Sequence, residues 1–278
     1  MGKIILKKPD IELLNKQGYN CVDLHTHTTY SDGTMNYNEI IKHTKKLKIG
    51  FSITDHNLIT GAIKACAQNK RNKNKQLIIP GIEVTTDKYK DLLFYFYDIA
   101  ELIEFYSKIK KDISRPKLKK VPKKIISSDE ILDISKQYNC LSSIPHPFCL
   151  RPKRAYKYFQ KKPTVLKKID AIEVINSILK KRRNEKAILW NLELEKAFTG
   201  GSDAHRLKDL GNVITGVKSN TVEDFLNGVL KKKNVVMGAP GKIPKKILSQ
   251  IRIAGTNIKI WSPLQRKPKQ KNNKIRKT

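Results

Sequence analysis

Short apolar segments alternate with amphipathic segments along this chain, and polar side chains able to bind metals follow the ends of the apolar ones. Apolar runs of about five residues predict strands, and apolar residues at helical spacing predict helices. Strands are expected at 19–24, 50–55, 77–84, 91–97, 141–145, 171–175 and 197–201, and helices at 37–48, 59–69 and 129–138. This alternation is typical of a parallel α/β sheet or barrel.

Five of the six histidines stand at predicted strand ends, and His43 alone lies on a predicted helix, where we interpret it as structural. His25 and His27 occupy positions i and i+2 of an extended segment, so both side chains point to the same side. Later strand ends add Asp55, His56, Glu83, His146, Asp203 and His205. The C-terminal strand ends of a parallel barrel converge on one face. The sequence therefore predicts that these side chains meet.

The chemistry of this set indicates a metal site. Imidazoles and carboxylates together suit Zn²⁺, Mn²⁺ or Fe²⁺, and the absence of cysteine argues against a structural zinc site. Each motif alone also fits a structural role, such as a turn carboxylate or a packed imidazole ring. Their joint occurrence at successive strand ends favours metal binding.

These motifs resemble the polymerase and histidinol phosphatase (PHP) family of metal-dependent phosphoesterases over about residues 20–237. The resemblance rests on the segments DLHTHTTYSDG (23–33), ITDH (53–56), PGIEV (80–84), IPHP (144–147), IEVINS (172–177) and GSDAH (201–205). It implies an α/β fold, a distorted seven-stranded (β/α)7 TIM-like barrel, with two or three divalent ions (Mn, Zn or Fe, with Mg as an alternative). The sequence contains no polymerase part, which indicates a stand-alone member.

The resemblance also implies the metal ligands. They fall into three groups: His25, His27, Glu83 and Asp203 for the first metal, Glu83, His146 and Asp91 for the second, and Asp32, His56 and His205 for the third. Within this set Glu83 would bridge two metals. Asp91 stands where many members carry a histidine, so the second metal site departs from the family pattern.

The implied reaction is hydrolysis of a phosphoester by a metal-activated water, without a side-chain nucleophile. Arg151, Arg154 and Arg206 follow the predicted ligands closely and are candidates for binding the substrate phosphate. A solvated surface position is the alternative for each of these three arginines.

The charge of the chain is strongly positive and uneven. Lysine and arginine number 57 against 25 acidic residues, a net charge of +32, while residues 1–100 contribute only 15 basic and 10 acidic groups. This excess favours an anionic partner, although a Lys-rich coding bias would also produce it. Among the substrates that the resemblance implies, this excess favours a nucleotide, a nucleoside bisphosphate or a short 5′-phosphorylated RNA or DNA. The alternatives are a small-molecule phosphatase of the histidinol phosphatase kind and an RNA-binding barrel with a vestigial metal site.

The predicted organisation is a PHP domain over residues 19–240, an extension over 241–261 and a disordered basic tail over 262–278. A helix over 243–253 would pack on the barrel or lie on anionic lipid. The four scattered cysteines are expected to be free thiols. With no signal peptide and no apolar run long enough to span a membrane, the protein is predicted to be cytoplasmic. The sequence leaves the oligomeric state open.

Overall fold

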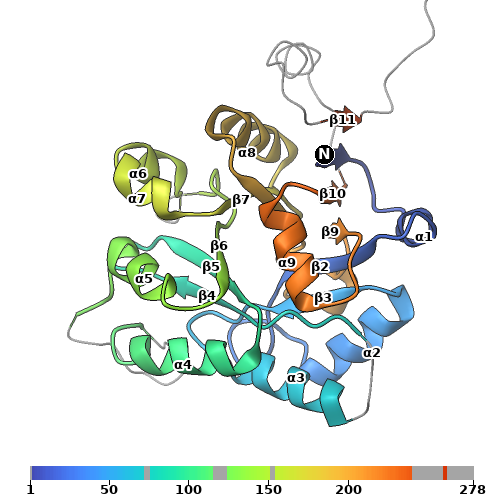
Figure 1. The fold of residues 1–278 in the computed structure, drawn as a ribbon, viewed down its shortest axis with the longest axis horizontal. Coiled ribbons are helices and arrows are strands. Elements are labelled where there is room, and N and C mark those ends of the chain that lie inside the picture. The colour runs from blue at the N-terminus through green and yellow to red at the C-terminus, as the bar shows by residue number, and fades with distance from the viewer. Residues whose placement is uncertain (1, 72–75, 115–123, 151–153, 240–258, 262–278) are drawn as a thin grey trace, which may run out of the picture.

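The computed structural model describes residues 2–71, 76–114, 124–150, 154–239 and 259–261, and its strands form two sheets (Figure 1). The first sheet has the order β11-β1-β10-β9-β2-β3. Its strands are β1 (Lys3–Leu6), β2 (Asn20–Thr26), β3 (Gly50–Ile53), β9 (Val213–Val217), β10 (Val235–Gly238) and β11 (Lys259–Trp261). Within it β2 pairs with β3 in parallel and with β9 antiparallel.

The second sheet has the order β4-β5-β6-β7-β8. Its strands are β4 (Gly81–Thr85), β5 (Asp91–Phe96), β6 (Cys140–Ile144), β7 (Ala171–Asn176) and β8 (Ala197–Gly201). β6, β7 and β8 are parallel, whereas β5 is antiparallel to both of its neighbours. The short segment 86–90 allows only a hairpin between β4 and β5, because a parallel connection needs a longer crossover.

Helices connect and cover the strands. They are α1 (Ile11–Lys16), α2 (Tyr37–Leu47), α3 (Thr60–Arg71), α4 (Ile99–Ile109), α5 (Ser128–Ser135), α6 (Tyr156–Gln160), α7 (Pro163–Lys168), α8 (Lys181–Leu194) and α9 (Val222–Leu230). In Figure 1, α2, α3 and α4 lie along the lower side of the molecule and α8 along the upper side. The predicted helices correspond to α2, α3 and α5, and a capping box opens α5, where Ser127 and Glu130 accept each other's backbone N–H.

The predicted distorted seven-stranded (β/α)7 barrel is not confirmed, since the described strands make two sheets of mixed direction and no closed barrel. Isolated bridges join Thr26 with Ala204, Phe51 with Ile78, and His56 with Glu83. The sheets also meet where the hydroxyl of Thr215 on β9 donates to the carbonyl of Gly200 on β8 at 2.9 Å. Both sheets therefore meet at the predicted ligands.

A large apolar core packs between the second sheet and α4. Phe94 and Phe96 of β5 are fully buried, and their rings lie 5.2 and 5.1 Å from the ring of Phe105 on α4. Burying an aromatic side chain of this size stabilises the fold by about 1.5–3 kcal/mol relative to leaving it exposed. The packed core holds the strand ends in fixed positions.

The predicted domain bounds stay a prediction. β1 and α1 precede the predicted domain start at residue 19, and β1 pairs with β10. Residues 241–258 and the tail 262–278 lie outside the described residues, while 259–261 form β11 beside β1. The four cysteines are free thiols. Among the helices of the described ranges, none combines the length and apolar character needed to span a bilayer, and a cytoplasmic location stays a prediction.

Candidate metal centre

The end of β2 places two histidines side by side, as the i, i+2 spacing predicts. His25 lies within β2 and His27 follows Thr26, and both side chains are fully buried. Their ring centroids lie 5.0 Å apart. The backbone N–H of His27 donates to the carbonyl of Ala204 at 2.9 Å, which anchors this strand end to the segment that follows β8.

The carboxylate of Glu83, on β4, lies at the centre of the imidazoles. Its Oε2 lies 3.3 Å from Nε2 of His25 and 3.4 Å from Nε2 of His27. The same oxygen lies 3.1 Å from Nδ1 of His56, and Oε1 lies 3.2 Å from Nε2 of His146. One fully buried carboxylate thus reaches four imidazoles, which is the position of a bridging ligand.

Asp203 closes the cluster from the end of β8. Its Oδ1 lies 3.2 Å from Nε2 of His27 and 3.6 Å from Nε2 of His25. Asp203 has a φ of 54° and His146 a φ of 31°, both in the left-handed region that non-glycine residues avoid. Such strain persists where surrounding bonds over-determine it, and here Asn176 donates to the Asp203 carboxylate at 3.2 Å.

Asp32, His56 and His205 form the rim of the cluster. Nε2 of His205 lies 3.2 Å, and Nε2 of His56 3.7 Å, from Oδ2 of Asp32. These side chains are 54% (Asp32), 19% (His56) and 29% (His205) exposed. Gly33 lets the turn that carries Asp32 fold tightly, because a Cβ at Gly33 would lie 2.2 Å from the carbonyl oxygen of His27. The rim is open to solvent where the centre is closed.

A residue to which the sequence assigned no role orients the inner ligands. Glu173, on β7, accepts from Nδ1 of His25 at 2.9 Å with Oε1, and from the backbone N–H of His146 at 2.7 Å with Oε2. Asn176 also donates to this Oε2, at 2.9 Å. A carboxylate that receives the second nitrogen of a metal-binding histidine fixes its tautomer and ring orientation. The sequence signal was a lone acid inside an apolar strand.

Two buried aspartates hold the backbone around the cluster. Asp23 accepts from the N–H groups of Ser202 and Gly211, each at 2.8 Å, and burial raises its pKa to about 6 although these bonds oppose the shift. Asp55 accepts from the backbone N–H of Thr28 at 2.7 Å. These contacts tie β2 to the segments after β8 and β3, so the ligand-bearing ends move together.

The inner groups shift one another's protonation strongly. Burial alone would lower the pKa of His25, but the carboxylates of Asp203, Glu173 and Glu83 raise it well above its usual range. Burial would likewise raise the pKa of Glu83, but the imidazoles of His56 and His25 hold it well below its usual range. The carboxylate of Glu83 is thus charged, and a bound cation would take the place of the protons on the imidazoles.

The rim shows the same pattern in a more exposed setting. A hydrogen bond with Asp32 raises the pKa of His205 to about 9, against the opposing effect of partial burial. In return the imidazoles of His205, His56 and His27 hold the pKa of Asp32 below its usual range although partial burial opposes this. The negative charge of the rim is therefore present at neutral pH.

The donor set fits divalent metal ions. The described residues contain four groups of three donors whose ligand atoms lie within 4.8 Å of one another: His25/His27/Asp203, His25/Glu83/His146, His27/Asp32/His205 and His27/His56/Glu83. Both ring nitrogens of His27 are buried and make no hydrogen bond, which is costly unless a ligand satisfies them. Imidazole and carboxylate donors suit Zn²⁺, Mn²⁺ and Fe²⁺. The centre can therefore hold metal ions.

Asp91 is the predicted ligand that belongs to none of these four groups. It begins β5, where the strand register places it opposite Thr85. Its Oδ1 accepts from Oγ1 of Thr85 at 2.6 Å, and the side chain is buried. Ligation by Asp91 stays a prediction.

The three candidate arginines differ in their surroundings. Arg151 lies outside the described residues. Arg154 is half-buried, and its Nε donates to the carbonyl of Cys149 at 3.1 Å. Cys149 follows the predicted ligand His146 by three residues. Arg206 pairs with Asp209 at 2.7 Å on the surface. Their binding of substrate phosphate stays a prediction.

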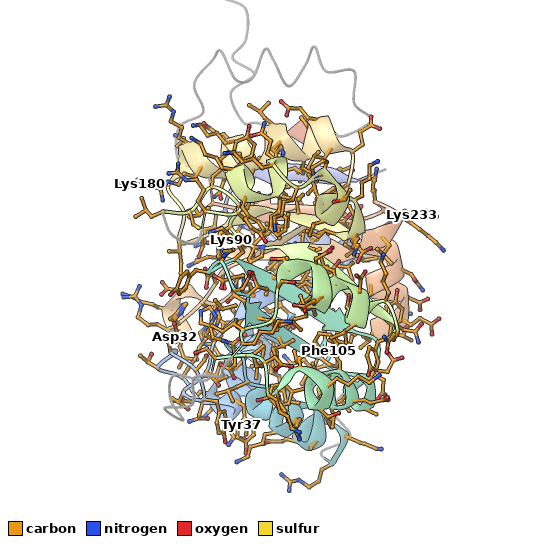
Figure 2. The ribbon with its side chains drawn as sticks, turned by 90° about the vertical axis from the view of Figure 1, so that its left-hand side faces the viewer. Asp32, Tyr37, Lys90, Phe105, Lys180 and Lys233 are labelled. Carbon is orange, nitrogen blue, oxygen red and sulfur yellow. The ribbon has the colours of Figure 1, made fainter. Side chains whose placement is uncertain are left out.

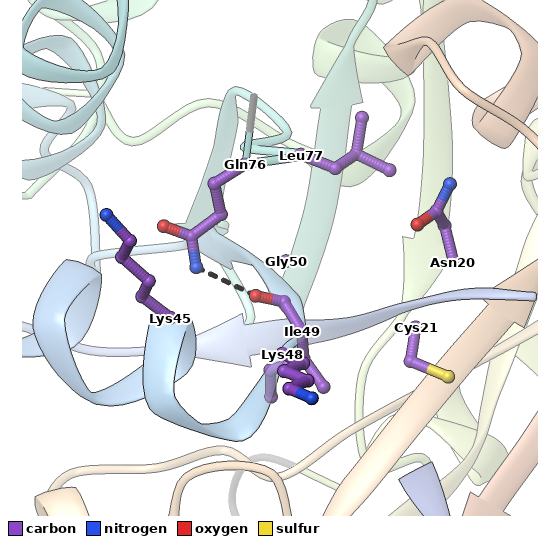
Figure 3. Close-up of a pocket in the computed structure, with 8 residues that line it drawn as sticks. All are labelled: Asn20, Cys21, Lys45, Lys48, Ile49, Gly50, Gln76 and Leu77. Atoms are coloured by element: carbon purple, nitrogen blue, oxygen red, sulfur yellow. Dashed lines mark hydrogen bonds between the residues drawn. The ribbon is translucent and has the colours of Figure 1, made fainter. Parts of the chain in front are cut away.

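A small cavity lies at the opposite ends of the first strands, away from the ligands (Figure 3). It has a volume of about 290 Å³ and is lined by the starts of β2 and β3, including Cys21 and Gly50. Gln76 closes one side by donating to the carbonyl of Ile49 at 2.8 Å. Burial raises the pKa of Cys21 to about 12, so this group stays a neutral thiol. The cavity lacks the donor set of the metal centre.

Family models match most of the described chain. The model described as PHP domain matches residues 23–188, and the model described as PHP-associated matches residues 181–234. The chain belongs to the PHP domain family. The PHP match begins at Asp23 and contains His25, His27, Asp32, Glu83 and His146, whereas Asp203 and His205 fall in the PHP-associated match. PHP-type phosphoesterases are metal-dependent hydrolases of phosphoester bonds, which agrees with the donor clusters.

Solved structures of PHP-like proteins share the fold at low sequence identity. A protein from Bifidobacterium adolescentis assigned as a metal-dependent phosphoesterase has 17% identity and a TM-score of 0.55, covering 76% of this chain and 96% of the other. The lesion-specific endonuclease Q of Pyrococcus furiosus has 18% identity and a TM-score of 0.60, covering 78% and 57%. Another endonuclease Q structure, in complex with a 27-mer duplex bearing an abasic lesion, has 19% identity and a TM-score of 0.60, covering 76% and 56%. No curated protein matches the sequence.

Proposed function

We propose that this protein hydrolyses a phosphoester of a nucleotide, a nucleoside bisphosphate or a short 5′-phosphorylated RNA or DNA, with a metal-activated water as the nucleophile. The observation that carries this proposal is the convergence of four imidazoles on the buried carboxylate of Glu83. Divalent metals bound there would supply a hydroxide at neutral pH and neutralise the charge of the phosphoryl group.

The residues of the chain divide the work of such a centre. Glu83 would bridge two metal ions, with His25, His27 and Asp203 on one side and His146 on the other. Glu173 would hold the imidazole of His25 in one orientation through its 2.9 Å bond to Nδ1. A ligand set fixed in this way would need little reorganisation during the reaction.

The rim would hold a third metal and meet the substrate. Asp32, His56 and His205 are the partly exposed members of the cluster, so the phosphate of a substrate reaches the centre from this side. Two or three divalent ions are consistent with the four donor groups. Mn²⁺, Zn²⁺ and Fe²⁺ suit the imidazoles, and Mg²⁺ is the alternative that suits the carboxylates.

A nucleotide or nucleic-acid substrate is supported by charge and by the structural neighbours. Residues 201–278 carry 18 basic and 4 acidic groups, and neutralised phosphates dominate the affinity for nucleic acid. The endonuclease Q neighbours are nucleases, one of them bound to duplex DNA. These points favour a nucleotide-based phosphoester over a small amino-alcohol phosphate.

An activity panel tests the proposal. The full chain would be assayed with Mn²⁺, Zn²⁺ and Mg²⁺ on histidinol phosphate, a 3′,5′-bisphosphonucleoside and a 5′-phosphorylated oligoribonucleotide. We expect hydrolysis of a nucleotide-based substrate, loss of it in His25→Ala, and wild-type activity in His43→Ala, which removes a histidine of α2 that belongs to none of the four donor groups. No hydrolysis of any phosphoester, with less than one metal per chain, would refute the proposal.

A further inference from the structure

A second cavity, here called the α8 cavity, lies where α8 begins, beside the loop that follows His146. It has a volume of about 420 Å³. Six basic side chains line it, namely Arg154, Lys157, Lys180, Arg182, Arg183 and Lys186, and no acidic side chain does. The remaining lining residues are two aromatics, Phe148 and Tyr156.

The described residues leave the positive charge of this cavity without ion pairs. Among the described residues, none of the six basic side chains forms an ion pair, and Arg154 alone makes a hydrogen bond, to the carbonyl of Cys149. The first turn of α8 contains no acidic residue. Glu185 of α8 is buried, and burial raises the pKa of its carboxyl although the nearby charges of Lys181 and Arg182 oppose this shift. Six cations gathered in this way repel one another and favour binding of a polyanion.

The α8 cavity is joined to the metal centre by one short chain of bonds. Asn184 of α8 donates to the carbonyl of Asn176 at 2.9 Å, and Asn176 donates from its own side chain to Asp203 at 3.2 Å. Phe148 follows His146 by two residues. In Figure 2, Lys180 and Asp32 lie at the same left-hand side of the molecule. The α8 cavity and the rim of the metal centre therefore face the same side of the molecule.

Aromatic rings form one wall of the cavity. The rings of Phe148 and Tyr156 stack at 4.5 Å, and both side chains are half-buried. Trp190, which is buried, supports them edge-on at 6.1 Å from Phe148 and 5.2 Å from Tyr156. A rigid aromatic surface next to cations is the combination by which proteins stack unpaired bases and hold their phosphates.

Charge in this molecule is sorted between its cavities. A larger cavity, of about 810 Å³, is lined by Asp98, Glu101 and Glu223 and by no basic residue. The positive lining near α8 is therefore not a mere consequence of the net charge of +32. Six cations also exceed what a single phosphate monoester requires.

We infer that the α8 cavity binds a single-stranded segment of nucleic acid that leads out of the metal centre, with its phosphates on the six basic side chains and a base against Tyr156 and Phe148. This inference rests on the proposed function, since it names the substrate class of the same centre. A single strand fits better than a duplex because only an unpaired base can reach the aromatic wall.

Binding of a labelled strand tests the role of the cations. The full chain would be titrated against a fluorescent 12-nucleotide single strand in chelator, so that the strand stays intact, at several salt concentrations. The variant is Arg182→Gln/Arg183→Gln/Lys186→Gln, and the matched control, Lys42→Gln/Lys46→Gln/Lys231→Gln, removes three exposed charges elsewhere.

We expect the cavity variant to bind about 10- to 100-fold more weakly at 0.1 M salt, with its salt slope reduced by about 2, since each lost contact to a single strand is worth about 0.7. The control should bind like the wild type, and thermal melting would show that both variants fold. Equal affinity and equal slope in the two triple variants would overturn the inference.

A second variant tests the aromatic wall. Tyr156→Leu keeps an apolar contact with Trp190 but removes the stacking surface, so affinity for the strand should fall about tenfold. Affinity for inorganic polyphosphate, which has charge but no bases, should not change. An unchanged affinity for the strand, or a duplex that binds as tightly as the strand, would overturn the assignment of a single-stranded ligand.

Failure of this inference is distinguishable from failure of the proposed function. Hydrolysis of p-nitrophenyl phosphate by the metal-loaded wild type tests the centre without the cavity, and the titration in chelator tests the cavity without hydrolysis. Hydrolysis of p-nitrophenyl phosphate, combined with equal binding of the strand by both triple variants, overturns only the inference about the α8 cavity. No hydrolysis of p-nitrophenyl phosphate or of any phosphoester in the activity panel, combined with the expected binding differences, overturns only the metal-dependent reaction.

Discussion

The inner and outer parts of the metal cluster are built differently although they share Glu83. His25, Glu83 and His146 are buried and are fixed by bonds from the protein, above all those of Glu173. Asp32 and His205 are partly exposed, and the bond between them lies at the surface of the cluster. The protein therefore fixes the inner geometry in advance and leaves the outer geometry adjustable.

This difference separates two tasks. A buried, pre-oriented set of ligands holds an ion tightly because little reorganisation accompanies binding. A partly exposed set admits water and substrate, and its electrostatic interactions are weaker because solvent screens them. We expect substitutions in the inner part to remove metal, and substitutions at the rim to change turnover while the inner ions stay bound.

The largest effect is expected for Glu83→Gln. Removing this bridging charge leaves four imidazoles without their common carboxylate, so bound metal should fall below one ion per chain and phosphoesterase activity about 10³-fold or more. Elemental analysis and a phosphatase assay measure both quantities, with His43→Ala as the control. Retention of full metal content in Glu83→Gln would contradict the central position of Glu83.

The next largest effect is expected at Glu173, which acts through His25. Glu173→Ala should weaken metal affinity about 10- to 100-fold, as is typical when the partner of a metal-binding histidine is removed. Glu173→Gln should recover part of this loss, because the amide oxygen of the new side chain can still accept a hydrogen bond from the backbone N–H of His146. Competition with a chelating dye measures the affinities. Equal affinities in the wild type and both variants would show that Glu173 does not position His25.

A smaller effect is expected at the rim. His205→Ala removes one partly exposed charged hydrogen bond, worth about 1.5 kcal/mol, and should lower kcat about tenfold while the inner ions remain. Metal content should fall by about one ion per chain and no further. A loss of all bound metal in His205→Ala would show that the inner and outer parts form one unit.

The smallest effect is expected on stability. A ligand at 100 times its Kd stabilises the folded state by about 2.7 kcal/mol, so adding chelator should lower Tm by about 5 to 10 °C for a domain of this size. His205→Ala should keep most of this response, and Glu83→Gln should show almost none. Differential scanning calorimetry measures the shifts, and equal responses in the two variants would erase the distinction between centre and rim.

Local signals in the sequence predicted much of the fold and most of the cluster. The caps of α2 and α5 involve residues three apart and are therefore visible in the sequence. The positions of His25 and His27 follow from the two-residue period of a strand. Of the predicted ligands within the described residues, all except Asp91 join a donor group.

The remainder depends on contacts between distant segments. Glu173 and His25 are 148 residues apart, and nothing local pairs them. The direction of β5 was also missed, because the alternation of strands and helices suggested parallel pairing throughout, whereas the short segment 86–90 forces a hairpin. That hairpin register in turn places Asp91 beside Thr85.

The meeting of two sheets at the ligands has a consequence for the order of folding. Glu83 lies 58 residues from His25, and Ser202 lies 179 residues from Asp23, so the cluster assembles only after long loops have closed. Contacts of such sequence separation form slowly. We therefore expect metal ions to bind after the fold has formed, so adding them after refolding should restore the same activity as having them present from the start.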